Sequence, residues 1–220
     1  FSCGQRKIIY LPIQNQNGMA LSSKQIIALG QVQGYGAKTV HNIAMMSKGE
    51  KINTARELMD FVNGSIRSKK VQRARPVEQQ EIEAAIKKAE QIINQSESLG
   101  IRITSFLDDD FPKNLLKTID ENGKPAIPTI LYYKGDLKAT ERKGIAIIGT
   151  REPTSNGLTA AKYLGRVFAE RGYNIVSGLA MGCDTGGHTG ALEAGGVTTA
   201  FLAHGLDMIY PEANSKLAEE

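Results

Sequence analysis

The sequence of 220 residues contains no tryptophan, only two cysteines and no long apolar run. About 20 consecutive apolar residues are needed to cross a bilayer, and runs such as Val197–Ala203 are far shorter, so no membrane-spanning segment is predicted. Residues 1–7 lack the apolar core of a signal peptide. Cys3 and Cys183 lie far apart in an otherwise cysteine-poor chain. This usage argues against a disulfide framework and predicts a cytoplasmic protein.

Charge is distributed unevenly along the chain. Residues 1–75 hold 12 lysines and arginines against 3 acids, a balance of +9, whereas residues 76–135 carry −3 and residues 136–220 carry −2. Five cations with no acid fall within Arg67–Arg75. Such a run attracts a polyanion in a salt-dependent way, but it is also typical of a solvated linker. Both interpretations stay open.

A small helical module is predicted over residues 19–66. Ser22 and Gln25 have the spacing of a capping box at a helix start. Gly34 and Gly36 flank a turn before a second helix, as in helix–hairpin–helix modules, and a free helix N-terminus can face a phosphate. Lys38 and Thr39 fall in the first turn of that helix, so they are possible secondary phosphate contacts. Packing alone, or partner binding, is the alternative use of such glycines.

Residues 77–99 have the apolar periodicity of an amphipathic helix, and residues 101–106 alternate as a strand. The run Asp108–Asp110 has no further ligand at metal spacing, so it is interpreted as a solvated turn, with no metal site.

The second half alternates strands and helices. Strands are predicted at residues 144–149, 173–177 and 197–203, and helices at residues 156–171, at 184–194 and from Glu212 onward. This repeat predicts an α/β fold, with a Rossmann-like, doubly wound, mostly parallel sheet preceded by the small all-helical domain. Ligands of such sheets bind beyond the carboxyl ends of the strands.

Two loops at that predicted edge carry groups suited to phosphate. The first holds Gly149, Thr150 and Arg151, which offer a close backbone approach, a hydroxyl and a guanidinium. The second contributes a hydroxyl and two glycines from Ser177, Gly178 and Gly182. Neither the dinucleotide fingerprint nor a P-loop is present, so no cofactor is predicted.

Asp184 and His188 lie four residues apart and could share one helix face. No nucleophile or second acid has a helpful spacing, so no catalytic residue is assigned. Cys183 is expected to be a small buried side chain rather than a reactive thiol.

Several of these segments together resemble the DNA-processing protein A family (DprA, also called Smf). The resemblance rests on Ile147–Arg151, Val176–Asp184 with His188, and Gly205–Asp207 with Tyr210–Pro211. Upstream, Phe111–Pro112 and Ile130–Gly135 are also similar to the family.

The resemblance implies a binding protein for single-stranded DNA that is not an enzyme. It also implies homodimerisation, protection of incoming strands and their delivery to a RecA-type recombinase during natural transformation or recombination. By the same likeness, the phosphate contacts fall at the two loops named above.

Four segments are expected on this basis. They are an unassigned leader at 1–18, the helical module at 19–66, a basic linker at 67–76, and a Rossmann-like domain at 77–220 whose C-terminal part is expected to be missing. Two other functions stay open. One is a Rossmann-like enzyme or sensor of a nucleotide-derived small molecule, and the other is an adaptor whose helical module docks a protein.

Overall fold

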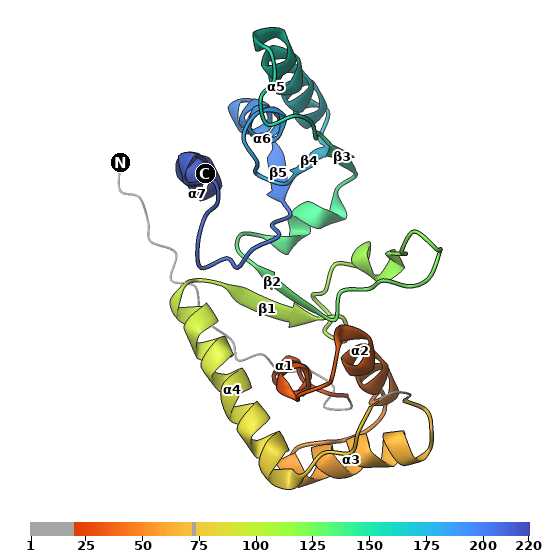
Figure 1. The fold of residues 1–220 in the computed structure, drawn as a ribbon. Helices are drawn as coiled ribbons and strands as arrows, with labels where there is room; N and C mark the ends of the chain where they lie inside the picture. Colours follow the sequence, from red (N-terminus) through yellow and green to blue (C-terminus); the bar gives the residue numbers. More distant parts are fainter. Residues whose placement is uncertain (1–19, 72–73) are drawn as a thin grey trace. The chain divides into compact units, whose positions relative to one another are not determined.

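The computed structural model describes residues 20–71 and 74–220, which divide into two compact units (Figure 1). The first comprises the described residues up to Gln95 together with Ile103–Phe111 and Pro128–Leu131, and the second holds most of the other described residues. None of the helices among the described residues has the length and apolar character needed to cross a membrane.

The first unit is built mainly from helices. Its helices are α1 (Ser23–Gln31), α2 (Ala37–Met46), α3 (Ala55–Arg67) and most of α4 (Gln79–Ser98). The predicted capping box at Ser22 is confirmed, since its hydroxyl accepts from the Gln25 amide and the Gln25 side chain returns to the Ser22 amide. Gly34 lies in the turn before α2 with φ +86°, a conformation that favours glycine.

The first unit extends past residue 77 and includes most of α4. Val77 and Ile82 are fully buried, and the backbone of Val77 exchanges two hydrogen bonds with the Asn63 side chain of α3. These contacts and the Lys24–Glu90 ion pair (3.2 Å) group α4, up to Gln95, with the preceding helices.

The acidic run Asp108–Asp110 closes a turn within the first unit. The Asp108 carboxylate accepts from the Ser23 hydroxyl (2.5 Å) and the Ser105 amide (2.8 Å), and Asp110 accepts from Thr104. The turn therefore links α1 to the strand β1 (Arg102–Ser105), which pairs with β2 (Ile130–Tyr133). In the described residues, no three or more His, Cys, Asp or Glu side chains gather as a possible metal site.

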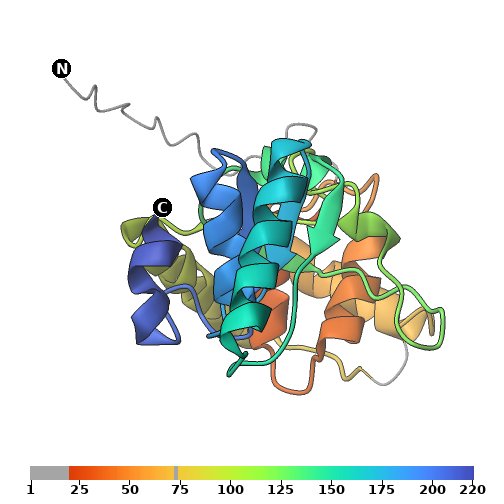
Figure 2. The same cartoon turned by 90° about the horizontal axis from the view of Figure 1, so that it is seen from above.

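The second unit contains the predicted parallel sheet. The strands β3 (Gly144–Ala146), β4 (Asn174–Ser177) and β5 (Val197–Ala200) lie in the order β3-β4-β5, all parallel. The helices α5 (Ser155–Glu170) and α6 (Cys183–Glu193) form the two crossovers, and they lie side by side on one face of the sheet (Figure 2). The α/β class is thus confirmed.

The core of this unit lies between that face and the two helices. Ile147, Ala161, Ala169, Ile175 and Ala191 are all buried there. The short segments of the unit are η1 (Leu115–Lys117), η2 (Leu137–Glu141), η3 (Glu212–Asn214) and α7 (Ser215–Glu219). β3 and β5 end earlier than predicted, at Ala146 and Ala200, whereas β4 ends at Ser177 as predicted.

Candidate nucleic-acid interface

Two loops meet at the carboxyl ends of β3 and β4, as the sequence predicts. Loop A (residues 149–154) follows β3, and loop B (residues 178–182) follows β4. Beyond the regular strand pairing, the Ile147 amide donates to the Val176 carbonyl (3.0 Å) and the Ser177 hydroxyl donates to the Ile147 carbonyl (2.6 Å). The Cys183 amide donates to the carbonyl of Thr150 (3.1 Å). These bonds hold the loops together at one edge of the sheet.

Two glycines are required for this close approach. A Cβ added at Gly149 would lie 2.7 Å from the Cys183 sulfur, and one at Gly182 would overlap the Thr150 carbonyl oxygen. Gly182 also has φ +84°, which a side chain rarely adopts. The sequence suggested that such glycines allow a ligand to approach the backbone. The structure gives these two a second role, since they allow one loop to contact the other.

The conformation of loop B depends on a buried carboxylate. Asp184, which is 4% exposed, accepts hydrogen bonds at Oδ2 from the amides of Gly178 (3.0 Å) and Ala180 (3.3 Å). The Asn214 side chain donates to the Leu179 carbonyl (2.9 Å), and Leu179 has φ +62°. These three bonds fix the loop. The two bonds to Asp184 also engage the Gly178 and Ala180 amides, which could otherwise face an anion.

Loop A presents its polar side chains to solvent. Thr150 and Arg151 are both exposed. The Thr150 hydroxyl accepts from the Glu152 amide (3.2 Å) and has no acceptor for its own hydrogen among the described residues. Arg151 makes no ion pair or side-chain hydrogen bond with any described residue. Both side chains can therefore donate to a bound anion.

The six predicted residues thus lie together, with different exposures. Gly149, Thr150 and Arg151 are exposed, whereas Gly178 and Gly182 are half-buried. Ser177 is buried, and its hydroxyl hydrogen is engaged by Ile147. Loop A therefore offers hydrogen-bond donors to a ligand. Ser177 and loop B stabilise the edge of the sheet from which loop A projects.

His188 is buried and stabilises the fold of the second unit. It is 2% exposed, and its Nδ1 lies 2.6 Å from the Thr198 hydroxyl, which donates to the Ile175 carbonyl. Nδ1 must therefore carry the ring proton, while Nε2 has no partner among the described residues. Burial lowers the pKa of His188, with a smaller opposing effect from Asp184. A neutral, enclosed imidazole joins α6 to the sheet.

Exposed apolar side chains flank the two loops, which the sequence did not reveal. Ile148 is 75% exposed beside Gly149, and Met181 is 43% exposed within loop B. Phe201 is 50% exposed, and its amide donates to the Ser177 carbonyl (2.9 Å). Ile148 and Phe201 lie within the predicted strands 144–149 and 197–203, and the structure shows that they lie beyond the ends of β3 and β5 and face solvent. Such side chains next to phosphate donors suit the faces of unstacked bases.

The second candidate location is the start of α2 in the first unit. Lys38 is exposed and Thr39 is half-buried, both in the first turn. Gly36 occupies the N-cap and supplies no side-chain hydrogen bond. The first-turn amides thus lack a side-chain cap.

The fold defines an α/β protein whose candidate site lies at the carboxyl ends of its parallel strands. The family model described as DNA recombination-mediator protein A matches residues 102–220, more than half of the chain. The protein therefore belongs to that family, which confirms the resemblance to DprA and Smf.

Two relatives illustrate the match. The chain is 35% identical over 161 residues to Protein Smf of a Synechocystis species, covering 67% of this chain and 40% of that protein. It is 38% identical over 117 residues to the DNA processing protein DprA of Streptococcus pneumoniae, covering 52% and 38% respectively. The chain thus spans well under half the length of these relatives.

The fold is also similar to a solved one. The X-ray structure of DNA processing protein A from Streptococcus pneumoniae aligns with a TM-score of 0.67 and 24% sequence identity. The alignment covers 91% of this chain and 64% of that chain.

Proposed function

We propose that this protein binds single-stranded DNA and that loop A contacts the sugar-phosphate backbone. Gly149 brings the chain close, while Thr150 and Arg151 donate hydrogen bonds to phosphate oxygens. Ser177, Gly178 and Gly182 complete the phosphate-binding edge by holding the neighbouring loop. The observation that carries the proposal is the exposed Arg151, which is unpaired among the described residues and follows a parallel strand at the edge where such sheets bind ligands.

The exposed apolar side chains favour a single strand over a duplex. Ile148, Met181 and Phe201 offer contacts to base faces, which are accessible only when the bases are unpaired. Lys38 and Thr39, at the uncapped start of α2, are proposed as secondary phosphate contacts.

The wider role follows from the family. Members are recombination mediators by description, so we infer that the protein protects incoming strands and loads a RecA-type recombinase onto them in natural transformation or recombination. In that role it would act as a homodimer in the cytoplasm, without a catalytic step. Asp184 and His188, the one candidate catalytic pair, are both committed to structural hydrogen bonds.

The test is fluorescence anisotropy of a labelled oligo-dT strand and of the matching duplex across a salt series. We expect the strand to bind more tightly than the duplex and to weaken as salt rises. Arg151→Ala should cost about 1–3 kcal/mol of binding free energy, because it removes charge-assisted hydrogen bonds. Lys113→Ala is the control. It removes an exposed cation of the same unit that belongs to neither loop.

Two outcomes would contradict the proposal. Equal losses in Arg151→Ala and Lys113→Ala would mean that loop A makes no specific phosphate contact. Saturable binding of a mononucleotide, with no preference for longer strands, would instead favour an enzyme or sensor of a nucleotide-derived small molecule.

A further inference from the structure

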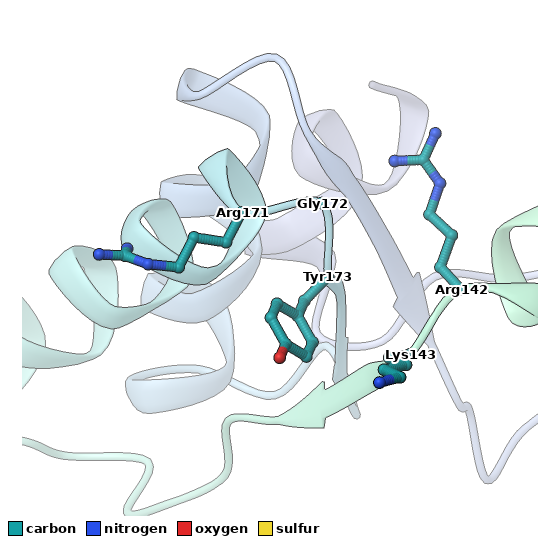
Figure 3. Close-up of a pocket in the computed structure, with 5 residues that line it drawn as sticks. All are labelled: Arg142, Lys143, Arg171, Gly172 and Tyr173. Atoms are coloured by element: carbon teal, nitrogen blue, oxygen red, sulfur yellow. The ribbon is translucent and has the colours of Figure 1, made fainter.

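A second cationic cluster lies at the opposite, amino-terminal edge of the same sheet. Arg142 and Lys143 directly precede β3, and Arg171, Gly172 and Tyr173 connect α5 to β4. The Asn174 amide donates to the Lys143 carbonyl (2.9 Å), which joins the two segments. Together the five residues line an open hollow of about 250 Å³ (Figure 3). We call it the amino-edge hollow.

The positive charge of this hollow is not neutralised by neighbouring acids. The two acids that end the adjacent helices are already engaged, Glu170 with Arg166 (2.8 Å) and Glu193 with Lys162 (2.6 Å). None of Arg142, Lys143 and Arg171 forms an ion pair with any described residue, not even with Glu141, the neighbour of Arg142 in sequence. Three cations thus share one hollow without a counter-charge.

One of these cations also has a structural role. Arg171 is the C-cap residue of α5, and its guanidinium donates to the Val167 carbonyl (2.7 Å). That bond uses one of the five N–H donors and holds the guanidinium against the last turn of α5. The other donors remain available to a ligand.

Tyr173 places an aromatic ring among the cations. The ring is half-buried and packs edge-on against Phe168, with centroids 5.9 Å apart at 79°. In Figure 3 it lies between the side chains of the two arginines, with the Arg171 head directed to one side and the Arg142 head to the other. Guanidinium groups that point apart are poorly placed to share one phosphate. They suit successive phosphates along an extended backbone, with a base stacked on the ring between them.

We propose that the amino-edge hollow is a second contact site for single-stranded DNA. Arg142, Lys143 and Arg171 contact separate backbone phosphates, and Tyr173 stacks on a base. This inference rests on the proposed function, because it assumes that the ligand of the protein is a nucleic-acid strand. The site is separate from loop A, since Arg142 and Lys143 precede β3 at its amino end whereas loop A follows β3 at its carboxyl end.

The test compares charge-matched variants in oligo-dT binding across a salt series. R142Q/K143Q/R171Q removes the cluster, and K113Q/K117Q/K124Q removes three exposed cations of the same unit that lie outside it. Each phosphate contact on a single strand contributes about 0.7 to the slope of log affinity against log salt. We expect the first variant to lose about 2 from that slope and on the order of tenfold in affinity at moderate salt. The control should keep the wild-type slope.

Two further measurements guard against a folding defect. R142Q/K143Q leaves the cap on α5 intact. It should show about two thirds of the reduction in slope that the triple variant shows. In the unmodified protein, irradiation of a strand carrying 5-iodouracil should cross-link Tyr173, as located by mass spectrometry.

The outcomes separate this inference from the proposed function. If Arg151→Ala weakens strand binding while R142Q/K143Q/R171Q behaves like its control, the amino-edge hollow is not a DNA site and loop A stands. A wild-type protein that binds no strand would overturn both. Loss of binding in R142Q/K143Q/R171Q without any cross-link at Tyr173 would exclude the proposed stacking.

Discussion

At the scale of single residues, the polar groups of the site divide into donors for a ligand and supports for the fold. Thr150 and Arg151 are exposed with donors to spare, while Ser177, Asp184 and His188 are buried and hydrogen-bonded within the unit. Residue type alone would rank the buried aspartate and histidine as the chemical groups. Their burial and hydrogen bonds show instead that Asp184 holds loop B and that His188 joins α6 to the sheet.

The buried histidine leads to a prediction about pH. The pKa of His188 is lowered by burial, so the unfolded state binds a proton more readily than the folded state. Stability should therefore fall as the pH drops below about 6.5, the ordinary value for histidine. We expect the melting temperature, followed by circular dichroism, to decrease between pH 7.5 and 5.5, and His188→Gln to reduce that decrease.

A matched control is available in the first unit. Burial also lowers the pKa of His41, with a smaller contribution from Lys48. His41→Gln should remove only its own part of the pH dependence and leave the part due to His188. If His188→Gln retains the full wild-type dependence, the buried imidazole is not the titrating group.

At the scale of secondary-structure elements, the contact between α5 and α6 depends on glycines. A Cβ added at Gly165 would overlap the Gly187 backbone, and one at Gly190 would overlap the Lys162 carbonyl. Glycine is unfavourable in a helix interior by about 1 kcal/mol. Here the glycines let the helix backbones come close together over the sheet.

A substitution of glycine by alanine is expected to change stability in opposite directions at Gly190 and at Gly30. Gly190→Ala should destabilise the second unit by about 1–3 kcal/mol, because the helices must move apart. Gly30→Ala, in α1 with open space around the new Cβ, should stabilise its helix by up to about 1 kcal/mol. Hydrogen exchange of peptides from each unit measures the two effects separately. Unchanged protection of α5 and α6 in Gly190→Ala would show that the helices can adjust without cost.

At the scale of the whole molecule, the excess of positive charge lies in the sequence before the segment that matches the family model. Residues 1–75 carry +9, whereas the match begins at residue 102. The start of α2 is the part of this basic region with both an exposed cation and a helix start lacking a side-chain cap. The first unit is therefore expected to add to DNA affinity.

This contribution can be measured with one pair of variants. Lys38→Gln should weaken oligo-dT binding by less than Arg151→Ala and lower the salt slope by about 0.7, because a lysine acts as a single point charge. Lys88→Gln, an exposed cation of α4 in the same unit, is the control and should leave the slope unchanged. Identical behaviour of the two variants would show that α2 makes no phosphate contact.

Much of the fold could be predicted because its signals are local. The capping box at Ser22 and the apolar stripe of α4 gave the helix positions, and the apolar run before Gly149 gave the parallel strand, although only Ile147 of that run is buried. The two loops of the candidate site followed from strand order, since parallel strands end at one edge. Which loop residues face solvent could not be predicted, because burial depends on contacts between segments far apart in the chain.

The sequence by itself determined the α/β class, the family and the location of the candidate site, because each rests on short motifs and their spacing. The tertiary structure decided which of the site residues face solvent and which stabilise the fold. It brought Gly182 against Thr150, buried Asp184 under loop B, and left Arg151 exposed without a partner among the described residues. It also joined residues 142–143 to residues 171–173 in one cationic hollow. Strand pairing and helix packing create these proximities between segments some 30 residues apart, and no local pattern encodes them.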